Sequence, residues 1–168
     1  MLHIVLYQPE IPQNTGNIIR TCVGFNAILH LIKPYGFIFS KNNPELKRSG
    51  VNYLEYMKVC EHNSWEDFIE SIKGAYDMFF LTRYGVNKPS DIKYTKTDTY
   101  LVFGKESTGI DKSILEKNKN KTIRIPSTKN VRSLNLSNCV AILAHDYCAK
   151  KNYKGLETKE PHKPLFKK

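Results

Sequence analysis

Five short apolar runs punctuate the chain, separated by longer stretches in which apolar and polar positions are mixed. Strands that are buried on both faces of a parallel sheet read as nearly continuous apolar runs, so each run predicts such a strand. The predicted strands cover residues 2–7, 28–32, 78–81, 100–103 and 122–125.

Helical patterns lie between several of the predicted strands. A turn at Pro12–Gly16 is expected to lead into a helix at Asn17–Phe25, with Asn14 or Thr15 as its N-cap. Ser64 is expected to cap a second helix, because acidic residues follow in its first turn. The alternation of strands and helices over 168 residues favours a single α/β domain with a mainly parallel sheet flanked by helices.

Two more helices are predicted at Asp111–Lys117 and Ser137–Lys150. The last one is apolar on more than one side, because the consecutive apolar residues 139–144 span every helical direction. Burial against both the sheet and a second subunit would explain this pattern and predicts a homodimer, with burial inside one chain as the alternative. We expect a domain at residues 1–153 and a loose basic tail at residues 154–168, which hold few apolar residues.

The net charge of +10 is concentrated at one end of the chain. Residues 1–110 hold 12 Lys and Arg against 11 Asp and Glu, whereas residues 111–168 hold 14 against 5. Such asymmetry favours a polyphosphate partner such as nucleic acid, since each neutralised phosphate releases counterions. A general lysine bias that solvates the surface is the alternative.

The four cysteines form no close C-x-x-C pair, and the five histidines are scattered along the sequence without metal-ligand spacing. We therefore expect reduced, mostly buried thiols and no metal. The first apolar run is too short for a signal sequence, and no run reaches the length of a membrane span. A cytoplasmic protein without membrane contact is expected.

A glycine-containing loop, Gly104-Lys105-Glu106-Ser107-Thr108-Gly109, follows the fourth predicted strand. It is not a Walker A loop, because Thr99 stands where the leading glycine is required, and the chain has no G-x-G-x-x-G. Two interpretations stay open. Glu106 could cap the next helix, or the backbone near Gly104 could hold a planar ring while Glu106 orients a charged group.

A second polar loop joins the last predicted strand to the last helix, from Arg124 to Ser137, and contains no acidic residue. Strand-to-helix junctions of α/β proteins are places where backbone donors and a helix N-terminus meet a ligand. The loop is therefore expected to hold a ligand beside a nucleic-acid surface.

Three segments in order resemble the motifs of the SPOUT superfamily of RNA methyltransferases: residues 14–20, residues 101–109, and Ile125-Pro126 with residues 133–138. The opening run at residues 6–17 is similar to that of the small tRNA wobble-nucleotide (nucleotide 34) 2′-O-methyltransferases, and residues 34–37 and 47–53 extend the similarity. The resemblance covers roughly residues 1–150.

This resemblance implies a trefoil knot in the C-terminal part of a homodimer, and S-adenosylmethionine as cofactor with S-adenosylhomocysteine as product. It implies a cofactor site lined by Leu81, Thr82, Gly104, Ile125, Pro126, Ser133 and Leu134. Much of that binding is expected through the backbone, which can read an adenine ring between apolar side chains.

The implied reaction is methyl transfer to a ribose 2′-hydroxyl of the wobble nucleotide, cytidine or modified uridine, most readily in leucine tRNAs. Arg20 matches the arginine that the family assigns to the hydroxyl or the adjoining phosphate, and Asn14, Glu106, Ser133 and Asn135 match its other catalytic polar positions. The dimer is expected to bind the anticodon arm of the tRNA through Arg20, Arg48, Lys129 and Arg132.

Other functions stay open at this stage. The rivals are a ribosomal RNA methyltransferase of the same superfamily, a catalytically silent RNA-binding homologue, and an enzyme of small nucleotides. His145 stands where relatives often carry an aromatic residue, which leaves the details of a dimer seam open.

Overall fold

The structure is a computed structural model that describes residues 1–40, 42–49 and 51–161. Within these ranges six strands form one sheet in the order β3-β2-β1-β5-β4-β6, and every pairing is parallel. The strands are β1 (Leu2–Tyr7), β2 (Ile28–Ile32), β3 (Val59–His62), β4 (Tyr76–Leu81), β5 (Asp98–Gly104) and β6 (Thr122–Ile123). The predicted α/β class with a mainly parallel sheet is confirmed.

The edge strands differ from the sequence-based prediction. The prediction missed β3, whose side chains are mostly half-buried at the end of the sheet, so that it lacks an apolar run. The prediction also made β6 too long, since the strand ends at Ile123 and not at Ile125. Arg124 still donates its backbone N–H to the carbonyl of Asn87 at 2.8 Å, which guides the chain away from the sheet.

The described helices are α1 (Pro12–Gly24), α2 (Pro44–Ser49), α3 (Trp65–Ser71), α4 (Lys112–Lys117) and α5 (Leu136–Lys150). Single 3₁₀ segments lie at Val51–Tyr56, Pro89–Asp91 and Lys119–Lys121. The expected N-cap of α3 is confirmed, because Ser64 Oγ accepts the backbone N–H of Asp67 at 3.1 Å.

The predicted start of α1 is wrong. The segment expected to be a turn is the first turn of the helix, which begins at Pro12, a residue whose fixed φ suits this position. Asn14 and Thr15 therefore lie inside the helix and do not cap it. The N-cap is Ile11, which offers no side-chain hydrogen bond to the helix.

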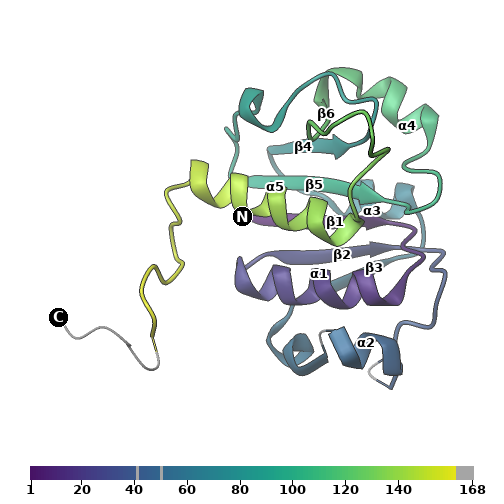
Figure 1. Cartoon of the computed structure of the whole chain (residues 1–168), viewed down its shortest axis with the longest axis vertical. Coiled ribbons are helices and arrows are strands. Elements are labelled where there is room, and N and C mark those ends of the chain that lie inside the picture. Colours follow the sequence, from purple (N-terminus) through teal and green to yellow (C-terminus); the bar gives the residue numbers. More distant parts are fainter. Residues whose placement is uncertain (41, 50, 162–168) are drawn as a thin grey trace.

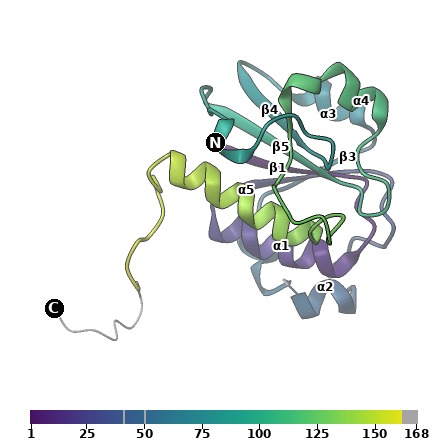
Figure 2. The ribbon, with the colours of Figure 1, turned by 45° about the horizontal axis from the view of Figure 1, so that its top comes forward.

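Helices cover both faces of the sheet (Figures 1 and 2): α1 and α5 lie side by side on one face, and α3 and α4 lie on the other. The alternation of side chains along β1 feeds both layers. Leu2, Ile4 and Leu6 join the larger core cluster with α1 and α5, whereas Val5 and Tyr7 join the cluster with α3. No helix within the described ranges is both long and apolar enough to span a bilayer.

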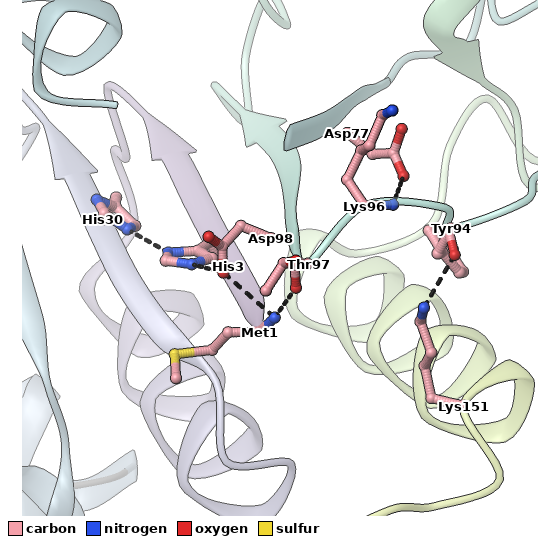
Figure 3. A network of polar contacts seen from close by, with 9 residues as sticks. All are labelled: Met1, His3, His30, Asp77, Tyr94, Lys96, Thr97, Asp98 and Lys151. Carbon is pink, nitrogen blue, oxygen red and sulfur yellow. Dashed lines mark hydrogen bonds and ion pairs between the residues drawn. The ribbon is translucent and has the colours of Figure 1, made fainter. Parts of the chain in front are cut away.

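Three of the histidines that are scattered in the sequence meet on the α3 side of the sheet. His3 Nδ1 lies 2.9 Å from His30 Nε2, and His30 Nδ1 lies 2.9 Å from His62 Nε2. At the other end His3 Nε2 lies 3.5 Å from Asp98, which also pairs with the N-terminal ammonium group at 3.3 Å (Figure 3). Burial lowers the pKa of all three rings, and that of His30 falls to about 3.

The four cysteines are free thiols, as expected. Cys22, Cys139 and Cys148 are buried and Cys60 is half-buried. Burial raises the pKa of the thiols of Cys22, Cys139 and Cys148, which keeps them protonated near neutral pH.

Candidate active site

A cleft of about 920 Å³ opens where the carboxyl ends of β4, β5 and β6 meet the segment that leads to α5. This edge of a parallel sheet is where α/β proteins bind ligands. The volume falls within the range of sites that enclose a small molecule or cofactor. Its walls combine the ends of strands with the 104–109 loop, the 124–135 segment and the first turns of α1 and α5.

Most of the predicted site residues line this cleft. They are Asn14, Leu81, Thr82, Gly104, Glu106, Ile125, Arg132, Ser133, Leu134 and Asn135. Pro126 is exposed and is not part of the lining, although its neighbours Ile125 and Ser127 are. Arg20 and Lys129 are exposed and lie outside the lining, and Arg48 belongs to α2 with its side chain outside the described part of the chain.

Glu106 joins the second sequence motif to the first and to the residues directly before it. Its carboxylate accepts the backbone N–H groups of Glu10 at 2.9 Å and Ile11 at 3.3 Å, and the side-chain amide of Asn14 at 3.1 Å. It therefore does not cap the helix that follows it; it holds the chain at the start of α1, where its negative charge also suits the helix N-terminus. The alternative in which Glu106 caps the helix that follows it is therefore wrong.

The same network continues to the last helix. Asn135 donates its side-chain amide to Asn14 Oδ1 at 3.0 Å, while its Oδ1 accepts from the backbone N–H of Ser137 at 2.9 Å as the N-cap of α5. Asn14 is 5% exposed, so its amide is held in one orientation by a donor on one side and an acceptor on the other. The network fixes the starts of two helices at one wall of the cleft.

Gly104 ends β5 with φ of +102°, a conformation that favours glycine. A Cβ at this position would lie 2.4 Å from the carbonyl oxygen of Tyr7, at the end of the neighbouring strand β1. The absence of a Cβ therefore lets the ends of β1 and β5 approach closely, and Gly104 lines the cleft with backbone atoms alone. A flat ring can approach such a surface closely, with Leu81, Ile125 and Leu134 as apolar neighbours.

Basic side chains outnumber acidic ones around the cleft. Six basic residues line it against three acidic residues: Arg83, Lys105, Lys112, Lys119, Arg124 and Arg132 against Glu106, Asp111 and Glu116. Asp111 is occupied by the Tyr7 hydroxyl, which donates to it at 2.5 Å, and burial together with this carboxylate raises the pKa of Tyr7. The opening of the cleft is thus suited to an anionic partner.

Arg20 lies on α1, and its guanidinium carbon is 5.4 Å from the centre of the Tyr53 ring. Arg20 is six positions beyond Asn14, and Tyr53 is 33 positions beyond Arg20. The fold of the chain, and not the local sequence, therefore brings Arg20 and Tyr53 together. A rise of 1.5 Å per helical residue places Arg20 about 9 Å along the axis from Asn14. The arginine is exposed and free to meet a ligand that extends from the cleft along α1.

Sequence reasoning missed several residues of the site. Tyr84 and Val86 line the cleft although they are 67% and 54% exposed, and they follow β4 in a turn that carries no motif. Ser107 lines the cleft and bonds to Glu10, which lies outside the lining. Both lie in segments that carried the resemblance, which was the signal available for them.

Comparisons with known proteins agree with this geometry. A model of the SpoU rRNA Methylase family matches residues 1–145. A relative from Bacillus subtilis strain 168, provisionally named tRNA (cytidine(34)-2′-O)-methyltransferase, is 44% identical over 158 residues, which are 93% of this chain and 97% of the relative.

Two solved structures share the fold. An RNA methyltransferase of Bacillus anthracis, also provisionally named, has a TM-score of 0.87 at 43% identity and covers 95% of this chain and 100% of its own. A structure described under 2-OH methylation of C/U34 on tRNA has a TM-score of 0.83 at 36% identity and covers 92% and 98%.

Proposed function

The chain belongs to the SpoU rRNA Methylase family, and on that premise we propose that it transfers a methyl group from S-adenosylmethionine to the ribose 2′-hydroxyl of nucleotide 34 in tRNA. The acceptor is cytidine or modified uridine at the wobble position, with leucine tRNAs as the expected substrates. The name of the 44% identical relative supports this choice. The observation that carries it is the convergence of Asn14, Glu106 and Asn135 on one cleft. Glu106 and Asn135 bond to Asn14 although they lie 92 and 121 positions from it in the sequence.

The donor half of the site is the backbone surface around Gly104. The residues present fit S-adenosylmethionine, because Gly104 offers only backbone atoms to the cleft and the apolar side chains of Leu81, Ile125 and Leu134 stand around it. Leu81, Thr82, Gly104, Ile125, Ser133 and Leu134 would hold the cofactor, since all six line the cleft. When bound, the cofactor supplies an activated methyl group and leaves as S-adenosylhomocysteine.

The acceptor half needs alignment and the removal of a proton from a weakly acidic hydroxyl. Arg20 is proposed to gather the hydroxyl and the adjoining phosphate with its planar fork and to lower the pKa of the hydroxyl. A guanidinium resists deprotonation, so a role as permanent base is disfavoured. Asn14, Glu106, Ser133 and Asn135 set the polar wall against which the ribose is placed.

The RNA is proposed to lie across the basic opening of the cleft and along α1. Lys129 and Arg132 are exposed on the segment before α5, and Arg20 is exposed on α1. Together with Arg48 of α2 they would hold phosphates of the anticodon arm. The protein is proposed to act in the cytoplasm, with residues 154–168 as a basic tail after the domain at residues 1–153. Within this tail Leu156 packs against the larger core cluster.

A homodimer and a trefoil knot complete the proposal. Ile142 of α5 remains 40% exposed although the same helix buries Val140, Leu143 and Ala144, which supports a second copy against this face. The chain leaves β6 beside β4 and reaches α5, which contacts α1, β1 and β5. This crossing of the sheet is compatible with a knotted C-terminal part.

The test uses labelled S-adenosylmethionine with purified leucine tRNA and, separately, ribosomal RNA. Label is expected in tRNA at nucleotide 34, and a tRNA that already carries a 2′-O-methyl group at this nucleotide is expected to accept none. Incorporation confined to ribosomal RNA would favour the second candidate, which the name of the family model supports. Cofactor binding without transfer to either pool would favour a silent RNA-binding protein.

A further inference from the structure

Two loops meet beside the cleft. Residues 8–11 join β1 to α1, and residues 105–109 lead from β5 towards α4. Because β1 and β5 are neighbouring parallel strands, both loops leave the same edge of the sheet. Lys105 donates to the side-chain carbonyl of Gln8 at 2.7 Å, which ties the bases of the two loops together.

Two carboxylates then bind the loops in opposite directions. The Glu10 carboxylate accepts the backbone N–H of Ser107 at 2.8 Å and its hydroxyl at 2.7 Å. The Glu106 carboxylate accepts the backbone N–H of Glu10 at 2.9 Å. Each glutamate is therefore held by the loop that carries the other one, and charge-assisted bonds of this kind are among the stronger ones in proteins.

The two glutamates differ in their relation to the cleft. Glu106 and Ser107 line it, whereas Glu10 does not. Glu10 is backed by Gly36, where an added Cβ would lie 2.7 Å from the Glu10 Cα, and the Gly36 N–H donates to the Pro9 carbonyl at 2.9 Å. Glu10 thus acts from outside the cleft, and its backbone has little room to shift.

We propose that Glu10 and Ser107 are positioning residues for methyl transfer, and that with Glu106 they form a latch that fixes α1 against the 104–109 loop. This inference rests on the proposed function. Glu106 accepts the backbone N–H groups of Glu10 and Ile11 directly before the first turn of α1, so the latch determines where α1 starts relative to Gly104. Arg20 is carried by the same helix, and the latch therefore sets the separation between the donor surface and the arginine that gathers the acceptor.

A latch of this kind affects alignment more than binding. Either ligand can still bind its own half of the site when the latch opens, but the two halves no longer hold one relative position. Small misplacements of reacting groups can lower a rate by about 100-fold. We expect Glu10→Ala to lower kcat about tenfold or more, while the Kd values for S-adenosylhomocysteine and for tRNA change by less than about threefold.

Conservative variants separate geometry from charge. Glu10→Gln can accept the Ser107 N–H through its carbonyl and donate its amide to the Ser107 hydroxyl, so it should retain at least about one third of kcat. Ser107→Ala loses one of the two bonds and should fall between Glu10→Gln and Glu10→Ala. Glu70→Ala and Ser113→Ala change exposed residues outside the cleft and serve as matched controls with unchanged kcat.

The experiment measures kcat per S-adenosylhomocysteine-binding site, both Kd values, and hydrogen exchange of the amides at positions 10 and 11. These amides should exchange faster in Glu10→Ala and Ser107→Ala than in the wild type and the controls. An unchanged kcat, a fall in kcat explained by lost binding, equal damage in Glu10→Gln and Glu10→Ala, or unchanged exchange would each overturn the latch. A wild type that methylates no RNA defeats the proposed function, and amide exchange still decides whether the latch exists.

Discussion

Replacing His30 by glutamine should flatten the dependence of stability on pH. His30 is 7% exposed and lies between His3 and His62, against the Phe68 and Tyr100 rings. One set of neutral tautomers satisfies this chain of rings: His62 donates to His30, His30 to His3, and His3 to Asp98. Glutamine removes the titrating group while keeping a donor and an acceptor.

The magnitude follows from the pKa of His30, which burial and then the neighbouring rings and Lys58 lower from 6.5 to about 3. Because the folded pKa lies below the unfolded one, the unfolded chain takes up the proton first, and stability is lost as pH falls from 6.5 towards 3. At 1.36 kcal/mol per pH unit the loss is about 2 kcal/mol at pH 5 and about 5 kcal/mol in full. The lowered pKa values of His3 and His62 act in the same direction, opposed by Asp98 and Asp67.

Urea unfolding at pH 7, 6 and 5 measures the effect. The wild type should lose about 2 kcal/mol more than His30→Gln between pH 7 and pH 5, although the variant starts from a lower stability at pH 7. His145→Gln, which changes an exposed histidine of α5, is the matched control. Parallel curves for the wild type and His30→Gln would refute the assignment of a buried neutral imidazole.

Four further outcomes are expected. Gly104→Ala should cost about 2 kcal/mol or more of unfolding free energy and abolish S-adenosylhomocysteine binding in calorimetry, because φ is +102° and a Cβ would lie 2.4 Å from a backbone oxygen. Arg20→Lys keeps the charge without the planar fork and should lower turnover about tenfold; equal turnover would contradict the proposed role. Ser64→Ala should cost about 1 kcal/mol in urea unfolding through loss of the α3 cap, with Ser113→Ala unaffected. The logarithm of RNA affinity should fall against that of salt with a slope of about −3 if four basic residues each neutralise a phosphate, and Lys129→Ala should make the slope shallower by about one.

The central strands could be predicted from the sequence, and the edges could not. Strands β1 and β2 match their predicted bounds because they lie inside the sheet and read as apolar runs. Strand β3 was not predicted, because an edge strand needs no continuous apolar run. The start of α1 was misjudged because Pro12 is compatible with both a turn and the first position of a helix.

The site shows the same division between local and distant information. The polar identity of Asn14, Glu106 and Asn135 was visible through the resemblance, but their mutual bonds depend on strand order. A carboxylate that holds the start of α1 from a loop more than 90 positions away leaves no local pattern, so this role of Glu106 was beyond sequence reasoning. The histidine chain is a similar case, because only the register of β1, β2 and β3 brings its rings together.

The walls of the cleft draw on residues from Ile11 to Cys139. During synthesis the ribosome must therefore add residue 139 before the nascent chain contains every residue that lines the proposed cofactor site. A chain that ends before residue 139 should bind neither the cofactor nor the RNA. Prematurely terminated products should therefore not compete with the complete protein for either one. Only chains translated at least as far as residue 139 can thus form the complete pocket.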